Sequence, residues 1–230
     1  MPIAILGPES DFPPLSEAEP EGILALGGDL SPERLLRAYA AGIFPWFGAG
    51  DPILWWSPDP RFVLRPEQLH VPASLRRLLR KEPFRFTCDR EFESVIAACA
   101  EPRPAQEGTW ITEDMREAYV RLHRLGYAHS VEAWAGAELA GGLYGVSLGA
   151  CFFGESMFSR QGNASKAALC FLAEALRQRS FALIDCQVHT SHLEALGARF
   201  IPRRTSLALL RRGLKRPTLQ GDWRDISPVV

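Results

Sequence analysis

Hydrophobic and polar positions divide the chain into two zones that meet at about residue 65. The first zone predicts one clear helix from Ser31, with Pro32 suited to the first helical position and Gly42 to the C-terminal stop. Its apolar stripe consists of Leu35, Leu36 and Tyr39. The aromatic-rich segments IFPWF and ILWWSPDPRF, with the zone's many prolines, indicate compact loops and short strands.

The second zone has the pattern of an α/β domain. We expect helices over 74–81, from Asp89 to about Cys99, from Thr112 to near Gly126 and over 163–179, with short ones in TSHLEALG and over 205–212. Strands are expected in FRFTC, HSVEAWA, ELAGGLYGV, ACFFGESMF and FALIDCQV, and AGAE joins the second and third of these as a hairpin.

An antiparallel meander followed by a helix and a strand is the order expected of an N-acetyltransferase-like sheet. We therefore predict a mixed α/β (α+β) fold. The two zones would then form a small N-terminal domain over residues 1–65 and an N-acetyltransferase-like domain over residues 66–230. Fold alone does not determine function.

Charge is unevenly distributed, although the formal net charge is only −1. Residues 1–33 contain acids and no Lys or Arg, whereas residues 203–216 contain cations and no acid. The near-neutral total argues against a generic polyanion binder. Local patches therefore decide where a phosphate backbone could bind.

The sequence favours a cytoplasmic protein without membrane association. It lacks a basic N-terminal signal region and any uninterrupted apolar run of about 18 residues. The five cysteines are scattered and form no CxxC pair, as expected of reduced thiols. His189 and His192 lack further ligands at a known metal spacing, so we expect no metal.

The strand over 181–188 carries a polar pair on a largely apolar face. Asp185 and Gln187 are two positions apart, so their side chains should share one face of the strand. We expect Asp185 to accept from the Gln187 amide, which leaves the Gln187 carbonyl oxygen to accept from a substrate amine. From this strand alone, a satisfied polar pair at a sheet end and a functional pair are equally good interpretations.

The segment 141–158 combines glycines with Phe and Met side chains. Glycine within a strand often marks close approach of a backbone or a ligand. Glu155 lies among apolar residues and could hold an ammonium group, while the neighbouring side chains could line an apolar pocket. An ordinary hairpin core with a surface Glu is the simpler interpretation of this segment alone.

Tryptophans and cations raise the question of RNA binding. Exposed indoles can stack on nucleobases, and the candidates are Trp46, Trp55, Trp56 and Trp110, although packing is the commoner role of tryptophan. Phosphate contacts are plausible for the segment 203–216 and for the predicted helix 74–81, through Arg76, Arg77, Arg80 and Lys81.

Six ordered motifs carry a specific resemblance. They are GGDLSPERLLRAYAAGIFPWF (27–47), WWSPDPR (55–61), GTWI (108–111), GGLYGVSLGACFFGESMFSRQGNASK (141–166), IDCQ (184–187) and LGARFIPR (196–203). In these motifs the sequence resembles the leucyl/phenylalanyl-tRNA–protein transferase family over roughly residues 20–205.

The resemblance implies transfer of Leu or Phe, and less efficiently Met, from aminoacyl-tRNA to proteins that begin with Arg or Lys. The products would enter the bacterial N-end-rule degradation route. It implies that no cofactor is needed, and we expect a monomer. By the same resemblance, Asp185 and Gln187 assist the attacking amine, and Trp46 and Trp110 bracket the terminal adenosine. The resemblance implies that the aminoacyl pocket contains Leu143, Phe152 and Met157, with Glu155 beside it.

Two other functions remain open from the residues. An acyl-CoA-dependent N-acetyltransferase could share the fold, but the stretch from Arg160 to Ala164 is one residue short of the usual pyrophosphate loop. A non-catalytic RNA-binding module would explain the tryptophans and cations, but not the pair of Asp185 and Gln187.

Overall fold

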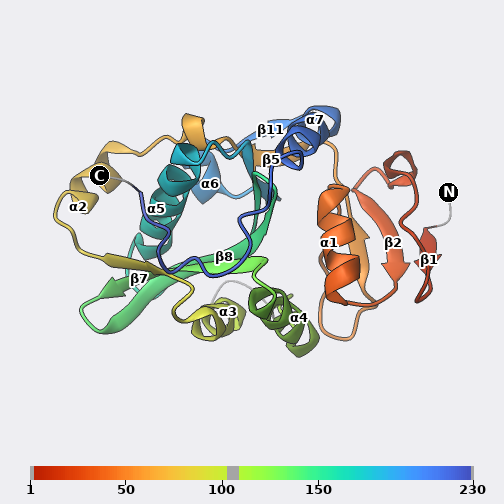
Figure 1. Ribbon diagram of the computed structural model, residues 1–230, viewed down its shortest axis with the longest axis horizontal. Helices are drawn as coiled ribbons and strands as arrows, with labels where there is room; N and C mark the ends of the chain where they lie inside the picture. The colour runs from red at the N-terminus through yellow and green to blue at the C-terminus, as the bar shows by residue number, and fades with distance from the viewer. Residues whose placement is uncertain (1–2, 103–108, 229–230) are drawn as a thin grey trace.

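Two β-sheets and the helices packed on them form the molecule (Figure 1). The computed structural model describes residues 3–102 and 109–228. The smaller sheet has four strands in the order β1-β2-β4-β3. Their bounds are Ala4–Leu6, Ile23–Gly27, Leu54–Trp56 and Phe44–Pro45, in that order. Helix α1, Pro32–Ala40, lies between this sheet and the rest of the molecule.

The larger sheet has seven strands in the order β11-β5-β10-β9-β8-β7-β6. Their bounds in this order are Arg199–Ile201, Arg61–Leu64, Leu183–Gln187, Cys151–Ser159, Glu138–Leu148, Ala128–Ala135 and Arg85–Cys88. Strands β7, β8 and β9 form the expected antiparallel meander, and β10 pairs parallel to β9. The mixed α/β fold is therefore confirmed, with the predicted order of meander, helix and strand.

Helices cover both faces of the large sheet. The remaining α-helices are α2 (Ala73–Leu79), α3 (Phe92–Ala100), α4 (Glu113–Arg124), α5 (Ala164–Gln178), α6 (Ser191–Ala195) and α7 (Arg203–Gly213). Short 3-10 helices are η1 (Leu15–Glu17) and η2 (Pro66–Gln68). Helix α5 packs in one hydrophobic cluster, while α1, α3 and α4 contribute to the other.

Local capping signals predicted several helix starts correctly. The Ser31 side chain accepts from the backbone N–H of Arg34 at the start of α1, and Thr112 accepts from that of Met115 at the start of α4. These signals depend on neighbouring residues only, so they survive in the tertiary structure.

The predicted cap at Asp89 is wrong. Helix α3 begins at Phe92, and the buried Asp89 carboxylate instead accepts from His129 Nδ1 and from the backbone N–H groups of Ser130 and Trp223. Asp89 has a φ of 53°, which turns its side chain into this site. Contacts distant in sequence thus outcompete the local cap.

The end of α1 packs against α7. Gly42 follows α1 with a φ of 77°, and a Cβ atom there would lie 2.6 Å from Leu207 Cδ2. The positive φ favours glycine at this position, and a larger residue would also require the Leu207 side chain to shift. This contact connects the first zone to the C-terminal helix of the large-sheet region.

Candidate active site

Side chains from three other elements converge on the carboxylate of Glu155, which lies in β9. Its Oε1 accepts from Tyr39 Oη of α1 at 2.8 Å and from Gln187 Nε2 of β10 at 2.9 Å. Its Oε2 accepts from Tyr119 Oη of α4 at 2.6 Å. The two tyrosine oxygens are themselves 2.5 Å apart. The three side-chain oxygen groups of Tyr39, Tyr119 and Glu155 form what we call the oxygen triangle.

The oxygen triangle has fewer hydrogen atoms than oxygen–oxygen contacts. It contains three oxygen–oxygen contacts, but the two hydroxyls supply only two hydrogen atoms. A proton on Glu155 would give each contact a hydrogen atom. The geometry therefore provides a place for one additional proton.

Electrostatics agree with this count. The pKa of Glu155 is raised to about 7, mainly by burial and to a smaller extent by the nearby Asp185 charge, while hydrogen bonds from Tyr119, Tyr39 and Gln187 oppose this rise. Burial and the Glu155 charge hold the pKa values of Tyr39 and Tyr119 well above their usual range. Both tyrosines thus remain hydroxyl donors at neutral pH.

Asp185 has a different partner from the expected one. Its carboxylate accepts from Arg61 Nε at 2.9 and 3.1 Å and from Arg61 Nη2 at 2.9 Å. Asp185 is 4% exposed and Arg61 is 2% exposed, so this is a buried bidentate ion pair. The side-chain amide of Gln187 donates to Glu155 instead. The expected side-chain bond between Asp185 and Gln187 is therefore wrong.

Asp185 still orients Gln187 through the backbone. Asp185 Oδ1 accepts from the Gln187 backbone N–H at 3.0 Å, where the pairing register of β10 with β5 shifts. Gln187 has a φ of 58°, a conformation that side-chain-bearing residues rarely adopt. This bond holds the end of β10 so that the Gln187 side chain reaches Glu155. No hydrogen bond within the described residues occupies Gln187 Oε1.

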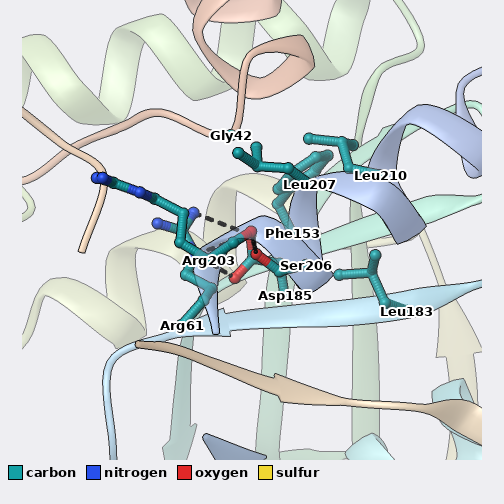
Figure 2. Close-up of a pocket in the computed structure, with 9 residues that line it drawn as sticks. All are labelled: Gly42, Arg61, Phe153, Leu183, Asp185, Arg203, Ser206, Leu207 and Leu210. Carbon is teal, nitrogen blue, oxygen red and sulfur yellow. Dashed lines mark hydrogen bonds and ion pairs between the residues drawn. The ribbon is translucent and has the colours of Figure 1, made fainter. Parts of the chain in front are cut away.

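A small cavity of about 10 Å³ lies beside the ion pair (Figure 2). Arg61, Asp185, Arg203 and Ser206 supply its polar lining, and the apolar lining comes from Gly42, Phe153, Leu183, Leu207 and Leu210. Within the described ranges Arg61 Nη1 has no hydrogen-bond acceptor, and the guanidinium carbon lies 4.6 Å from the centre of the Phe44 ring. The cavity therefore lies between β5, β10 and the apolar face of α7.

A β-bulge at Glu155 separates two groups of side chains. Tyr144 pairs with Ser156 and Gly145 pairs with Gly154, so Glu155 is the additional residue of β9. Phe152 and Met157 are five positions apart, which in a regular strand would put them on opposite faces. The bulge instead places both beside the α5 cluster, whereas Glu155 contacts the tyrosines on the other face.

The structure brings together the residues expected to line an apolar pocket. Leu143 is paired with Met157 across β8 and β9, and Leu143 and Phe152 are almost completely buried. The nearby glycines serve internal packing. A Cβ atom at Gly145 would lie 2.6 Å from the Phe152 ring, and one at Gly142 would lie 2.7 Å from the Val131 carbonyl oxygen.

The two expected stacking residues differ in exposure. Trp46 is 39% exposed, and its ring centre lies 5.4 Å from that of Trp56, whose Nε1 donates to the Trp46 carbonyl. Trp110 is partly buried and packs against the cluster that contains α1 and α4. Trp46 thus has the more accessible ring.

The predicted basic helix lies at the other end of the large sheet from α1 (Figure 1). Helix α2 begins at Ala73 and ends at Leu79, so Arg80 and Lys81 follow it. Arg76, Arg77, Arg80 and Lys81 are all exposed. These cations are therefore remote from the oxygen triangle.

Sequence reasoning missed three residues of the site. The sequence pattern places Tyr39 in an apolar helix stripe and gives no role to Tyr119 or Arg61. Two signals could have indicated them: the Tyr39 hydroxyl within an apolar helix stripe, and Arg61 at the start of an apolar strand. In the ranges 3–102 and 109–228, no helix has the length and apolar character to cross a membrane, and no grouping of three His, Cys, Asp or Glu could hold a metal ion.

Comparison with known proteins gives a consistent result. The leucyl/phenylalanyl-tRNA protein transferase model matches residues 63–211, and the model of that family's N-terminal domain matches residues 28–59. Proteins named leucyl/phenylalanyl-tRNA–protein transferase are similar over nearly the whole chain. The one from Syntrophus aciditrophicus is 64% identical, over 97% of this chain and 94% of its own.

Two further relatives with that name extend the comparison. The protein from Anaeromyxobacter sp. strain K is 61% identical over 97% of both chains. The protein from Myxococcus xanthus is 56% identical over 98% of this chain and 97% of its own. With these similarities and the two matched segments, the chain belongs to the leucyl/phenylalanyl-tRNA–protein transferase family, a family of enzymes.

Proposed function

We propose that the protein transfers Leu or Phe, and less efficiently Met, from aminoacyl-tRNA to proteins with N-terminal Arg or Lys. Family membership supports the reaction class. The convergence of Tyr39, Tyr119 and Gln187 on Glu155 is the observation that carries the assignment of the reaction centre. We also propose that the enzyme acts as a cytoplasmic monomer that marks its products for N-end-rule degradation.

The reaction is aminolysis of an activated ester. The acceptor's α-amino nitrogen forms a bond with the ester carbonyl carbon, and the bond from that carbon to the ribose oxygen breaks. One proton leaves the nitrogen, and one is finally needed on the ribose oxygen. The ester supplies the free energy, so the enzyme contributes chiefly by orienting the amine and moving its proton.

Gln187 is suited to orient the amine. Its Nε2 donates to Glu155, which directs Oε1 away from that carboxylate and leaves it to accept from an amine. Asp185 contributes indirectly, because its carboxylate is occupied by Arg61 and by the Gln187 backbone N–H. In this proposal Asp185 and Arg61 position Gln187 and do not take the proton.

Glu155 is suited to receive the proton. The oxygen triangle has a place for one additional proton, and burial raises the pKa of Glu155 to about 7. A base with a pKa near the working pH can both accept and return a proton. Return of that proton to the leaving ribose oxygen would complete the cycle without a cofactor.

The remaining binding roles follow the family resemblance. We propose that Trp46 and Trp110 stack on the terminal adenosine and that Leu143, Phe152 and Met157 contact the aminoacyl side chain. We also propose that Arg76, Arg77, Arg80 and Lys81 contact phosphates of the tRNA. The exposure of Trp46, the shared face of the apolar residues and the exposure of the cations support these roles.

The test mixes the dialysed protein with Phe-tRNA labelled on Phe and a peptide that begins with Arg. We expect the label on the peptide N-terminus without acetyl-CoA, ATP or added metal. A matched peptide with a blocked N-terminus should stay unlabelled. Acetylation of the peptide by acetyl-CoA, without transfer of Phe, would contradict the proposal. Glu155→Gln should bind donor normally and lose single-turnover transfer.

A further inference from the structure

Helix α7 has an apolar face that is already covered by the rest of the protein. Ser206, Leu210 and Gly213 are buried, and Leu207 packs on Gly42 at the end of α1. Ser206, Leu207 and Leu210 line the cavity that also contains Asp185 (Figure 2). The inner face of α7 is therefore adjacent to the candidate active site.

The outer face of α7 is strongly cationic. Arg204 and Arg211 are seven residues apart, which places them on one face of α7, and Lys215 lies in the turn that follows the helix end at Gly213; we call these three cations the stripe. At a rise of about 1.5 Å per residue, Arg204 and Arg211 are roughly 10 Å apart along the axis. Arg212 and Arg216 flank this stripe, and all five are exposed.

The stripe cations are not neutralised by acids of the fold. Residues 203–216 contain no Asp or Glu. Of the ion pairs found within 3–102 and 109–228, none uses Arg204, Arg211 or Lys215. Arg203 is different, because its guanidinium donates to the Ser57 carbonyl and its backbone N–H donates to Asp59. The outward cations are thus available to an external polyanion.

We propose that the stripe of Arg204, Arg211 and Lys215 binds phosphates of the donor RNA close to its aminoacylated end. This inference rests on the proposed function. A helix with its side chains is about 10–12 Å thick, so the stripe lies roughly one helix diameter from the cavity that Asp185 lines. That span corresponds to the last nucleotides and the acceptor stem. Helix α2, at the far end of the large sheet, would contact more distant phosphates (Figure 1).

RNA fits the α7 surface better than an anionic membrane does. A membrane-surface helix needs an apolar face that is free to enter the lipid boundary. The apolar face of α7 is packed on β5, β10 and the end of α1. Binding the phosphates of a folded RNA requires only the outward cations, which displace the counterions condensed on the RNA.

The test measures binding of two probes by fluorescence anisotropy at several salt concentrations. One probe is full-length phenylalanyl-tRNA with a non-hydrolysable 3′-amide, and the other is a minihelix of its acceptor stem with the same end. The variant combines Arg204→Gln, Arg211→Gln and Lys215→Gln. Gln has nearly the helix propensity of Arg and Lys, so α7 should remain folded, as circular dichroism would verify.

The charge-matched control combines Arg116→Gln, Arg177→Gln and Arg224→Gln. These arginines are exposed and pair with Glu113, Glu174 and Asp222, respectively. The control removes the same charge from other surfaces. The second comparison neutralises the α2 group with Arg76→Gln, Arg77→Gln, Arg80→Gln and Lys81→Gln.

We expect the α7 variant to bind both probes about tenfold more weakly at moderate salt, with a log–log salt slope shallower by about 2. The control should match the wild type, and the α2 variant should weaken full-length tRNA only. An α7 variant with unchanged affinity for the minihelix and an unchanged salt slope would overturn the inference. The inference would also be overturned if the α7 variant lost binding to phosphatidylglycerol vesicles while its RNA binding stayed intact. Absence of Phe transfer by the wild type would instead contradict the proposed function.

Discussion

Tyr39 donates a hydrogen bond of 2.8 Å to Glu155 across a separation of 116 residues. Tyr39 lies in α1 of the first zone, and Glu155 lies at a bulge of the large sheet. The first zone therefore supplies a hydrogen-bond donor to the candidate active site. This bond makes the position of α1 relative to the large sheet a determinant of the chemistry at Glu155.

The first prediction concerns the pH dependence of transfer. Glu155 accepts three hydrogen bonds, and its protonation would fill the place for the amine proton. Because the pKa of Glu155 is raised to about 7, kcat/KM should fall as pH decreases through about 7. Glu155→Gln should show low activity without that dependence.

The α-amino group of the acceptor peptide also titrates near neutral pH. The control therefore measures the rate of a single turnover across the same pH range with the peptide at saturating concentration. Glu138→Gln, at an exposed acid that begins β8, should retain the wild-type profile. A wild-type profile with full activity well below pH 6 would argue against Glu155 as proton acceptor.

The second prediction concerns stability. Folding raises the pKa of Glu155 from its ordinary 4.5 to about 7, so the folded state binds a proton more tightly between these values. The free energy of unfolding should therefore decrease as pH rises from about 4.5 to about 7, and this contribution should change no further above that. Denaturant titrations of wild type and Glu155→Gln should differ progressively across this window. A constant difference between them would exclude a shifted pKa at this residue.

The third prediction separates positioning from binding at the ion pair. Arg61→Ala leaves the buried Asp185 carboxylate uncompensated, which should destabilise the fold by about 3–5 kcal/mol. Arg61→Lys keeps the charge but loses the bidentate geometry. It should therefore fold and lower kcat, with little change in KM for the donor. If Arg61→Lys raised KM and left kcat intact, Arg61 would contact substrate and would not act through Asp185.

The fourth prediction concerns stacking on the donor. Trp46→Ala should weaken binding of aminoacyl-tRNA by about 1–3 kcal/mol if the exposed indole stacks on a base. Trp46→Phe keeps an aromatic face and should retain most of the affinity, which separates stacking from loss of packing on Trp56. Equal affinities of all three proteins, measured by equilibrium binding, would remove Trp46 from the RNA site.

The fifth prediction concerns selectivity for the aminoacyl group. Met157→Ala should enlarge the apolar space beside Leu143 and relax the preference for Phe and Leu over Val and Ile. Discrimination by size contributes only about 1–3 kcal/mol, so the wild-type preference should be incomplete. Met157→Leu conserves volume approximately and should retain the ranking. Rates from a panel of aminoacyl-tRNAs measure this, and equal wild-type rates for Val and Leu would contradict the pocket assignment.

The sequence by itself determined the elements whose signals are local. Ser31 and Thr112 accept from backbone N–H groups three residues ahead, and alternation with turn residues specifies the β7–β9 meander. Each signal depends on residues close together in the chain, so it can be recognised before the fold is known. The family motifs likewise identified the segment that contains Asp185 and Gln187.

Tertiary structure alone decided which polar groups meet. Arg61 and Asp185 are 124 residues apart, and their pairing redirects the Gln187 amide to Glu155. The additional residue at Glu155 changes which side chains share a face of β9, since it interrupts the two-residue period from which a sequence pattern is interpreted. Buried polar groups take whichever partners the fold brings within reach, and the high cost of leaving them unpaired makes those distant contacts prevail over local ones.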